Sequence, residues 1–423
     1  MSRSLVLLLA GLLSPVSLLA ADPPREVAGR IAATIENEYF DPAAGTRIAG
    51  ELRRASDNGA FDRLQDPREL ATALSDRLRP LDRHFVVRWS PPGTEPPGPQ
   101  RGPVRDPATS NFGIRRVQLL PGNIGYLELG YFADIDFDDP AAPARVAIDA
   151  ALQLLAHADA VVVDVRDNGG GSPAMVGYLA SAFVAPGAKI YNTFRWREGG
   201  ASEAPGYEHP APRTTVPLYV LTSGRTGSAA EAFAYTLGNA GRAVLVGEAT
   251  GGAANPGRPF DVGGGFSVFV STGSPVSPIT GRNWEGSGVQ PQVEVEAAEA
   301  LVRAQELALA RLVADGGGDQ GASWVLEALR SRAPAPDPAT VQVLAGEYGT
   351  LRIEALSDGL QLRQGRRPPQ RLRALDAAGL FYFESDPARR LRFDRGADGV
   401  PVALELVWPE GEVVRHVRGQ AAD

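Results

Sequence analysis

The spacing of hydrophobic residues in the first part of the chain is typical of helices. From about residue 26 to residue 81, apolar side chains recur every four residues, which places them on one helical face. The positions that carry this pattern are Val27, Ile31, Ile35, Tyr39, Leu70, Leu74 and Leu78. We therefore expect an N-terminal helical subdomain over residues 22–90, followed by a Pro-rich linker over residues 91–111.

Farther along, strand-like and helix-like segments alternate. Apolar runs such as ADAVVVDVR and VPLYVLTS have the length of buried strands, and stretches such as ARVAIDAALQLLAH lie between them. This alternation predicts an α/β core over residues 112–315. After a second linker at residues 316–340, short alternating segments separated by Gly and Asp predict an all-β domain over residues 341–423, as a meander or barrel.

The first 21 residues have the parts of a secretory signal peptide. Arg3 precedes an apolar run from Leu5 to Leu13, Pro15 follows, and small residues lead into a charged segment. A membrane anchor is the alternative, but the uninterrupted run is well short of the ~20 residues that cross a bilayer. We predict cleavage near Ala20 or Ala21, a periplasmic or secreted protein, and no integral membrane segment in the mature chain.

Composition removes several kinds of chemistry. The 423 residues include 42 Lys+Arg against 50 Asp+Glu, a net charge of −8, which argues against nucleic acid as a partner. The absence of cysteine excludes thiol nucleophiles and disulfides, and Lys189 is the only lysine. Phosphate-loop and His-x-x-x-His patterns are also missing, so we expect neither a metal nor a cofactor. An acidic loop, FADIDFDDP, could bind calcium weakly or stay solvated, and we expect it to be solvated.

The stretch LTSGRTGSAAEAFAYTL at residues 221–237 joins a buried strand to a helix that begins at Ser228. A serine hydroxyl at this junction lies near free backbone amides, and the Ala229 amide could donate to a developing oxyanion. The alternative is purely structural. Ser228 could cap the helix with Glu231 at the third helical position, which is a capping box.

A second stretch, ADAVVVDVRDNGGG at residues 158–171, ends a buried strand in polar residues and glycines. Glycines let the backbone present bare amides to a ligand, so Gly169 or Gly170 could supply a second oxyanion donor. An ordinary strand-to-helix turn would explain the same residues.

Four motifs in order, VVVDVRDNGGG, TSGRTGSAAE, LVGEATGGA and EGSGVQP, resemble the tail-specific and tricorn-like serine peptidases. The resemblance covers roughly residues 26–315. It is closest to the branch without an inserted PDZ domain, which interphotoreceptor retinoid-binding protein modules share. It implies a core related to the ClpP/crotonase spiral fold, with Ser228 as nucleophile. The C-terminal β domain lies outside it.

The general base has two precedents in these families. The tail-specific branch uses a lysine about two dozen residues after the serine, but the turn here, GEATGGAANPG, has none. The tricorn branch uses a histidine from the N-terminal helical region, a placement that His84 matches. Arg83 replaces tricorn's assisting serine, and Asp82 is either an orienting group or a turn residue. A strand-edge role remains the alternative for His84.

The resemblance also implies a supporting glutamate before a Gly-Val-x-Pro-Asp turn, and Glu285 occupies that position. Gln292 stands where the family has its aspartate. His157, His209 and His416 are expected to be structural.

These observations lead to a specific hypothesis. We expect an exported serine peptidase that cleaves peptides or polypeptides through an acyl-enzyme, with Ser228 as nucleophile and His84 as base. Gly170 and Ala229 would form the oxyanion hole, and Glu285 would support the site. The alternative is an inactive binding module of the same fold that carries a hydrophobic ligand or a peptide. A crotonase-like acyl-CoA enzyme fits neither the export signal nor the absence of a site for CoA phosphates.

Overall fold

The computed structural model describes residues 22–91, 106–316, 320–376 and 379–419. The predicted signal segment, residues 1–21, lies outside them, as does most of the Pro-rich linker. The chain divides into two compact units. Residues 257–273 belong with the first 101 residues in one unit, and the remainder of the chain forms the other. Segment 257–273, placed by sequence in the α/β core, thus packs with the N-terminal helices instead.

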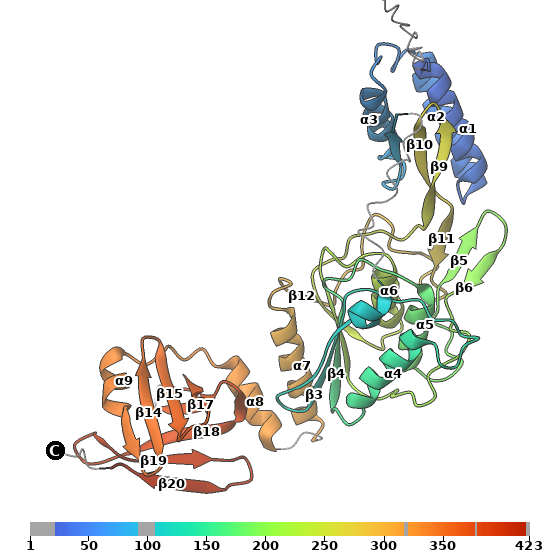
Figure 1. Cartoon of the computed structure of the whole chain (residues 1–423). Coiled ribbons are helices and arrows are strands. Elements are labelled where there is room, and N and C mark those ends of the chain that lie inside the picture. Colours follow the sequence, from blue (N-terminus) through green and yellow to red (C-terminus); the bar gives the residue numbers. More distant parts are fainter. Residues whose placement is uncertain (1–21, 92–105, 317–319, 377–378, 420–423) are drawn as a thin grey trace, which may run out of the picture. The chain divides into compact units, whose positions relative to one another are not determined.

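Three helices and a small sheet make the N-terminal unit (Figure 1). The helices are α1 (Pro24–Glu38), α2 (Pro42–Asp57) and α3 (Pro67–Leu78), and the strands are β1 (Val86–Trp89), β9 (Gly257–Gly263) and β10 (Phe266–Ser271). Strand β10 lies between β1 and β9 and is antiparallel to both. The predicted helical faces are confirmed, because Ile31, Ile35 and Leu74 are fully buried.

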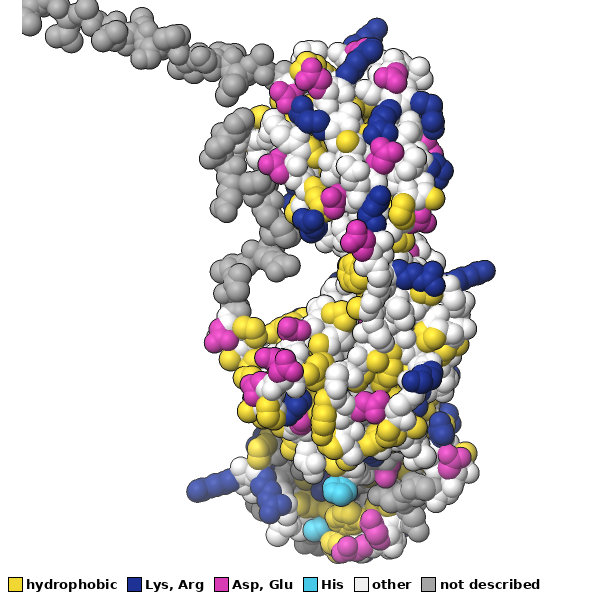
Figure 2. Space-filling view, turned by 90° about the vertical axis from the view of Figure 1, so that its right-hand side faces the viewer, with side chains coloured by type: hydrophobic (Ala, Val, Ile, Leu, Met, Phe, Trp, Pro, Cys, Tyr) yellow, Lys and Arg dark blue, Asp and Glu magenta, His cyan; other side chains and the backbone are white. Residues whose placement is uncertain are grey.

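Aspartate side chains cap the amino-terminal ends of α2 and α3. Asp41 accepts hydrogen bonds from the Ala43 and Ala44 amides, and Asp66 accepts one from Arg68. Each aspartate satisfies amides that the first helical turn leaves without a partner. On the face that Figure 2 shows, acidic and basic side chains are interspersed over this unit.

A six-stranded sheet forms the core of the second unit, in the order β12-β8-β7-β4-β3-β2. Its strands are β2 (Ile114–Leu120), β3 (Ile124–Leu129), β4 (Ala160–Asp164), β7 (Leu218–Thr222), β8 (Val244–Gly247) and β12 (Val293–Glu294). All neighbours are parallel except β2 and β3. The expected α/β class is therefore confirmed.

Side chains on both faces of this sheet are buried. On β4, Val161 and Val163 pack in one hydrophobic cluster, whereas Val162 packs in the other. Strands buried on both faces read as continuous apolar runs, which is why AVVVD shows no alternation. The first cluster includes residues of α4 (Pro143–Leu154), α5 (Pro173–Ser181) and α6 (Ala229–Asn239), and the second those of α7 (Ala300–Ala314) and α8 (Gln320–Arg330).

Smaller elements complete this part of the chain. A 3-10 segment, η1 (Pro107–Gly113), leads into β2. Strands β5 (Thr193–Trp196), β6 (Gly200–Ser202) and β11 (Gly273–Val276) form a three-stranded sheet in the order β11-β5-β6. Among the helices of the described ranges, none is both long and apolar enough to cross a bilayer.

The C-terminal strands form the barrel-like domain expected from the sequence (Figure 1). Helix α9 (Pro338–Leu344) precedes the strands β13 (Gly346–Tyr348), β14 (Leu351–Leu356), β15 (Gly359–Gln364), β16 (Gln370–Ala374), β17 (Leu380–Phe383), β18 (Asp386–Arg395), β19 (Pro401–Val407) and β20 (Val413–Val417). Each pairs antiparallel with the next in the sequence, and an isolated bridge between Tyr348 and Arg418 joins the two edge segments. Closure of this kind removes exposed sheet edges.

A carboxylic acid is buried between the small sheet and α6. Glu203 is 3% exposed, and its Oε2 accepts a hydrogen bond of 2.8 Å from Asn192 Nδ2. The same Asn192 Nδ2 lies 3.0 Å from Thr236 Oγ1 on α6. Within the described part of the chain, Glu203 Oε1 has no hydrogen-bond partner. Because burial disfavours the charged form, the pKa of Glu203 rises from 4.5 to about 7.

This shift predicts that the folded protein loses stability as the pH rises. Between pH 4.5 and about 7 the unfolded chain releases the Glu203 proton while the folded chain retains it, so the free energy of unfolding falls across this window. Glu203→Gln keeps the shape without ionising, and at pH 8 it should be more stable than the wild type by up to about 3 kcal/mol. Urea titrations at several pH values measure the difference. The control is Glu198→Gln at an exposed position; equal pH slopes for wild type and Glu203→Gln would contradict the prediction.

Candidate active site

Ser228 occupies the turn between β7 and α6, as the sequence predicts, and its backbone conformation is unusual. Its φ is 53° and its ψ is −120°. The ψ value lies far from the left-handed helical region in which asparagines and other non-glycine residues with positive φ are normally found. A non-glycine residue in such a conformation costs about 1–3 kcal/mol, and strain of this kind clusters at active sites. A sharp strand-to-helix turn also projects a serine hydroxyl away from the backbone.

The Glu231 side chain stabilises this turn through hydrogen bonds. Its buried carboxylate accepts a hydrogen bond of 2.8 Å from the Ser228 amide, which is one half of the expected capping box. It also accepts hydrogen bonds from the loop that follows β8: 2.5 Å from Thr250 Oγ1, 2.6 Å from the Gly252 amide and 2.8 Å from the Ala253 amide. One carboxylate therefore ties the serine turn to the loop over residues 250–253. The capping interaction and a strained serine coexist at this position.

Hydroxyl groups join the serine turn to the Gly-rich turn after β4. Ser223 Oγ donates to the Arg166 carbonyl at 2.6 Å, and Thr226 Oγ1 donates to the Val165 carbonyl at 2.9 Å. The Gly227 amide donates to the Asn168 carbonyl at 3.0 Å. The polar residues of the TSGRTGS motif thus fix the positions of two loops that are far apart in the sequence.

The Asp-Val-Arg portion of the first motif has a structural role. Asp164 Oδ2 accepts hydrogen bonds from Tyr126 at 2.7 Å and from Arg166 at 2.6 Å. The Arg166 guanidinium also donates a hydrogen bond of 2.5 Å to the Ala297 carbonyl. This network fastens the end of β4 to its neighbour β3 and to the segment before α7.

Gly170 lies directly against Ser228. A Cβ on Gly170 would come within 2.7 Å of Ser228 Cβ and 3.1 Å of its Oγ, and φ at this glycine is +120°. Only glycine fits both the contact and the conformation. The Gly170 amide, however, donates to Asn168 Oδ1 at 2.9 Å. Asn168 is fully buried, and within the described residues its Nδ2 has no partner.

Ala229 is the other residue whose amide is expected to donate to an oxyanion. It is the first residue of α6, where amides have no intrahelical acceptor, and in the described ranges its amide makes no hydrogen bond. The sequence missed the part that Asn168 plays here, because nothing in the Asp-Asn-Gly-Gly pattern reveals which acceptor the Gly170 amide chooses.

Glu285 reaches the same loop as Glu231. Its Oε2 accepts hydrogen bonds from the Ala254 amide at 2.9 Å and the Asn255 amide at 3.0 Å. Two carboxylates therefore bind successive amides of residues 252–255. Gln292, which replaces the expected aspartate, accepts a hydrogen bond of 2.7 Å from the Leu245 amide and so anchors β8.

His84 lies in the N-terminal unit, between α3 and β1, and pairs with a buried carboxylate. His84 Nδ1 is 3.0 Å from Asp82 Oδ1, and the His84 amide donates to the same oxygen at 2.9 Å. Asp82 Oδ2 accepts hydrogen bonds from Tyr39 at 3.0 Å and Ser271 at 2.7 Å. Although burial alone would raise the pKa of Asp82, hydrogen bonds from His84 and Ser271 outweigh burial and hold this pKa below its usual value.

The comparisons with known proteins agree with the motifs. Residues 123–295 match the profile of Peptidase family S41. The chain carries an S41 domain. This S41 domain contains Ser228, Gly170, Ala229 and Glu285, whereas His84 lies outside it.

Three of the similar proteins are described here by identity and coverage. Over 182 residues the chain is 29% identical to the chloroplastic carboxyl-terminal-processing peptidase 1 of Arabidopsis thaliana; the match spans 43% of this chain and only about a third (35%) of the relative's length. A crystal structure described as that of a peptidase from Parabacteroides merdae shares 18% identity at a TM-score of 0.49. That match covers 70% of this chain and 98% of the Parabacteroides merdae chain. The photosystem II D1 C-terminal processing protease shares 17% identity at a TM-score of 0.41. That match covers 67% of this chain and 97% of the protease chain.

The contact between Gly170 and Ser228 in the S41 domain leads to a matched pair of substitutions. Gly170→Ala should displace the serine or its turn, because the added methyl group has no space. We expect peptide hydrolysis to fall by about 100-fold or more, as small misplacements at a reacting centre do. Gly169→Ala adds the same methyl group where nothing lies within 4 Å, so it should leave activity within about twofold. Steady-state kinetics on one peptide substrate compares them; equal losses would remove the steric argument.

Proposed function

We propose that the S41 domain hydrolyses peptide bonds with Ser228 as its nucleophile. The observation that carries this proposal is the strained Ser228 backbone at the strand-to-helix turn, with Gly170 packed against the side chain. A structural helix cap has no need of positive φ, since the usual N-cap conformation is extended. Strain that is stabilised by the surrounding hydrogen bonds is expected where a side chain must be presented for reaction.

The reaction would proceed through an acyl-enzyme. Ser228 Oγ attacks the carbonyl carbon of the scissile bond while a base takes the hydroxyl proton. The carbonyl oxygen becomes an oxyanion that the Ala229 amide stabilises. The proton then passes to the departing amine as the C–N bond breaks, and water releases the acyl group in a second attack.

In this scheme the Gly170 amide is the second oxyanion donor. Its hydrogen bond to Asn168 Oδ1 must then be shared with the oxyanion or given up during the reaction. Asn168 is consequently a positioning residue for the oxyanion hole.

His84 is the proposed base, with Asp82 as the group that orients it. When Nδ1–H of the imidazole donates to the ionised Asp82, proton transfer uses Nε2, as in a Ser-His-Asp triad. Tricorn has an assisting serine just before its histidine, where this chain has Arg83. We assign the orienting role to Asp82 instead. The scheme requires His84 and Ser228 to meet in the working enzyme.

Glu285 is proposed to support the site by fixing the backbone of Ala254 and Asn255. The substrates would be peptides or polypeptides, and the protein would be exported after removal of its first 20 or 21 residues. Residues 22–90 would form the helical subdomain that supplies the base, and residues 341–423 a separate β domain.

Ser228→Ala tests the nucleophile. It should reduce hydrolysis of a fluorogenic protein substrate by about 10⁴-fold or more, since the remaining groups provide only electrostatic assistance. It should also abolish covalent labelling by a fluorophosphonate, which reacts with activated serines. Ser223→Ala, a nearby serine that bonds a backbone carbonyl, is the control and should still be labelled. Unchanged hydrolysis by Ser228→Ala would refute the assignment, and a wild type without labelling or hydrolysis would favour the binding module.

Asp82→Asn tests the orienting role. The amide cannot hold the imidazole in the required tautomer as a carboxylate does, so kcat should fall by about 10²–10⁴ with little change in KM. Ser271→Ala removes another hydrogen bond from the same carboxylate without touching the imidazole, and it should keep kcat within about fivefold. A pH profile of kcat/KM separates the effects: if Asp82 merely stabilises the fold, both variants should lose activity together with thermal stability and keep the wild-type pH dependence.

A further inference from the structure

The interior of the C-terminal barrel changes from apolar to polar at one end. Inward-facing positions alternate along each strand, and most carry leucine, isoleucine or phenylalanine. Four strands break this rule at inward positions near one mouth of the barrel, where they carry Gln364, Gln370, Arg389 and His416. Polar residues at interior positions of a barrel need a reason, because burial of unpaired polar groups is costly.

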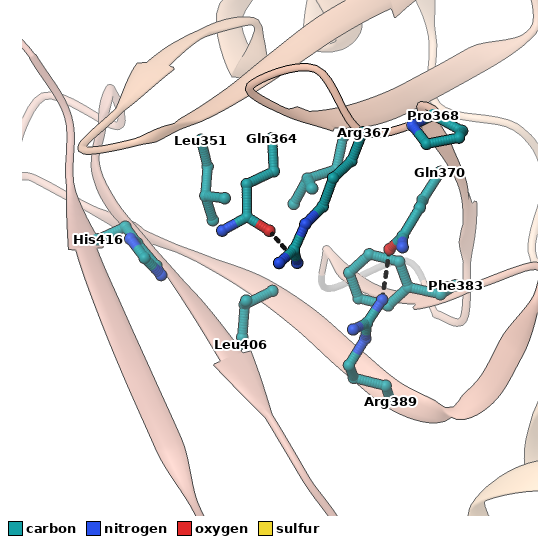
Figure 3. Close-up of a pocket in the computed structure, with 10 residues that line it drawn as sticks. Leu351, Gln364, Arg367, Pro368, Gln370, Phe383, Arg389, Leu406 and His416 are labelled. Atoms are coloured by element: carbon teal, nitrogen blue, oxygen red, sulfur yellow. Dashed lines mark hydrogen bonds between the residues drawn. The ribbon is translucent and has the colours of Figure 1, made fainter.

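These side chains line a cavity of about 90 Å³ (Figure 3). Arg367, on the exposed loop between β15 and β16, and Arg389, on β18, extend into it from different walls. Its apolar floor includes Leu351, Phe383 and Leu406. Barrel mouths are a recurrent place for small-ligand sites with an apolar lining and few polar groups.

The two arginines lack acidic partners. Arg367 donates to Gln364 Oε1 at 3.0 Å, and Arg389 donates to Gln370 Oε1. In the described part of the chain, neither guanidinium forms an ion pair. By contrast, outward-facing arginines of the same barrel pair with carboxylates: Arg363 with Glu354, Arg373 with Glu384, and Arg392 with Glu405. Neutral glutamines thus orient the inner guanidinium groups without neutralising them.

Arg389 also has a donor without an acceptor. Its Nε is buried and, within the described residues, makes no hydrogen bond. Its guanidinium stacks on the Phe383 ring at 3.9 Å, which fixes its orientation. Burial lowers the pKa of Arg389, and the charge of Asp386 acts in the opposite direction. A desolvated guanidinium with a vacant donor favours an anion in the cavity.

The geometry points to a carboxylate-binding site at this mouth of the barrel, with Arg389 and Arg367 as the ligands of the anion. The volume is about that of three water molecules, enough for the carboxylate and the start of an aliphatic chain, whose remainder would extend through the mouth of the barrel. The apolar floor favours a carboxylate attached to a short aliphatic group over a phosphate, whose remaining oxygens would face leucine and phenylalanine. A free short-chain acid and the carboxyl terminus of a polypeptide both present this chemistry. This inference does not rest on the proposed peptidase activity.

Calorimetric titration of the full mature chain with butyrate, in low-salt buffer free of other carboxylates, tests the site. We expect saturable binding to one site that weakens at least tenfold in Arg389→Gln. The matched control is Arg392→Gln, which removes an outward arginine from the same strand and should bind as the wild type does. Absence of saturable binding to the wild type, or equal binding to both variants, would overturn the inference.

Two further measurements make the result decisive. Arg367→Gln changes an exposed loop residue, so it tests the site even if Arg389→Gln fails to fold; it should weaken butyrate binding severalfold. A short acetylated peptide with a free carboxyl terminus is then compared with its amide. Binding of butyrate and of the free-carboxyl peptide, but not of the amide, assigns a polypeptide terminus. Binding of butyrate alone assigns a free acid, and failure of all three refutes the site.

Discussion

The buried carboxylate of Glu231 is the interaction on which the site depends. A polar group without exposure is costly to bury unless hydrogen bonds replace the water it loses. Glu231 receives four such bonds, from the Ser228 and Thr250 groups and from two amides of the following loop. Because the serine turn is strained, it needs an anchor of this strength. The same anchor makes the serine turn and the loop over residues 250–253 one rigid element.

Loops at the carboxyl ends of three adjacent parallel strands build the site. Gly170 follows β4, Ser228 follows β7 and the loop held by Glu231 follows β8. Parallel strands bring their carboxyl ends to one edge of a sheet, and ligands bind there in open α/β sheets. Side chains of Ser223 and Thr226 bind the backbone of the neighbouring loop, so these hydrogen bonds help to set the spacing between the two loops.

The strand runs, the helical faces and the serine turn could be predicted from sequence because each depends on residues close together in the chain. Long-range effects could not. Nothing local shows that Glu231 reaches residues 250–253, that Asn168 accepts from the Gly170 amide, or that residues 257–273 extend the N-terminal sheet. From the sequence, Asp82 is either an orienting group or a turn residue. In the structure it lies beside His84, and the hydrogen bonds that it accepts from Tyr39 and Ser271 come from distant segments that no local pattern reveals.

The pairing of Trp89 with Phe266 has a consequence for how the protein forms. A chain that emerges amino-terminus first exposes β1 long before its partner β10 exists. The N-terminal unit therefore cannot complete its sheet until nearly the whole α/β core has been delivered, and loop closure over such a distance is slow. The C-terminal barrel is the opposite case, since each strand pairs with the one just before it. Assembly order thus runs against chain order: the first segment to appear is among the last to be finished.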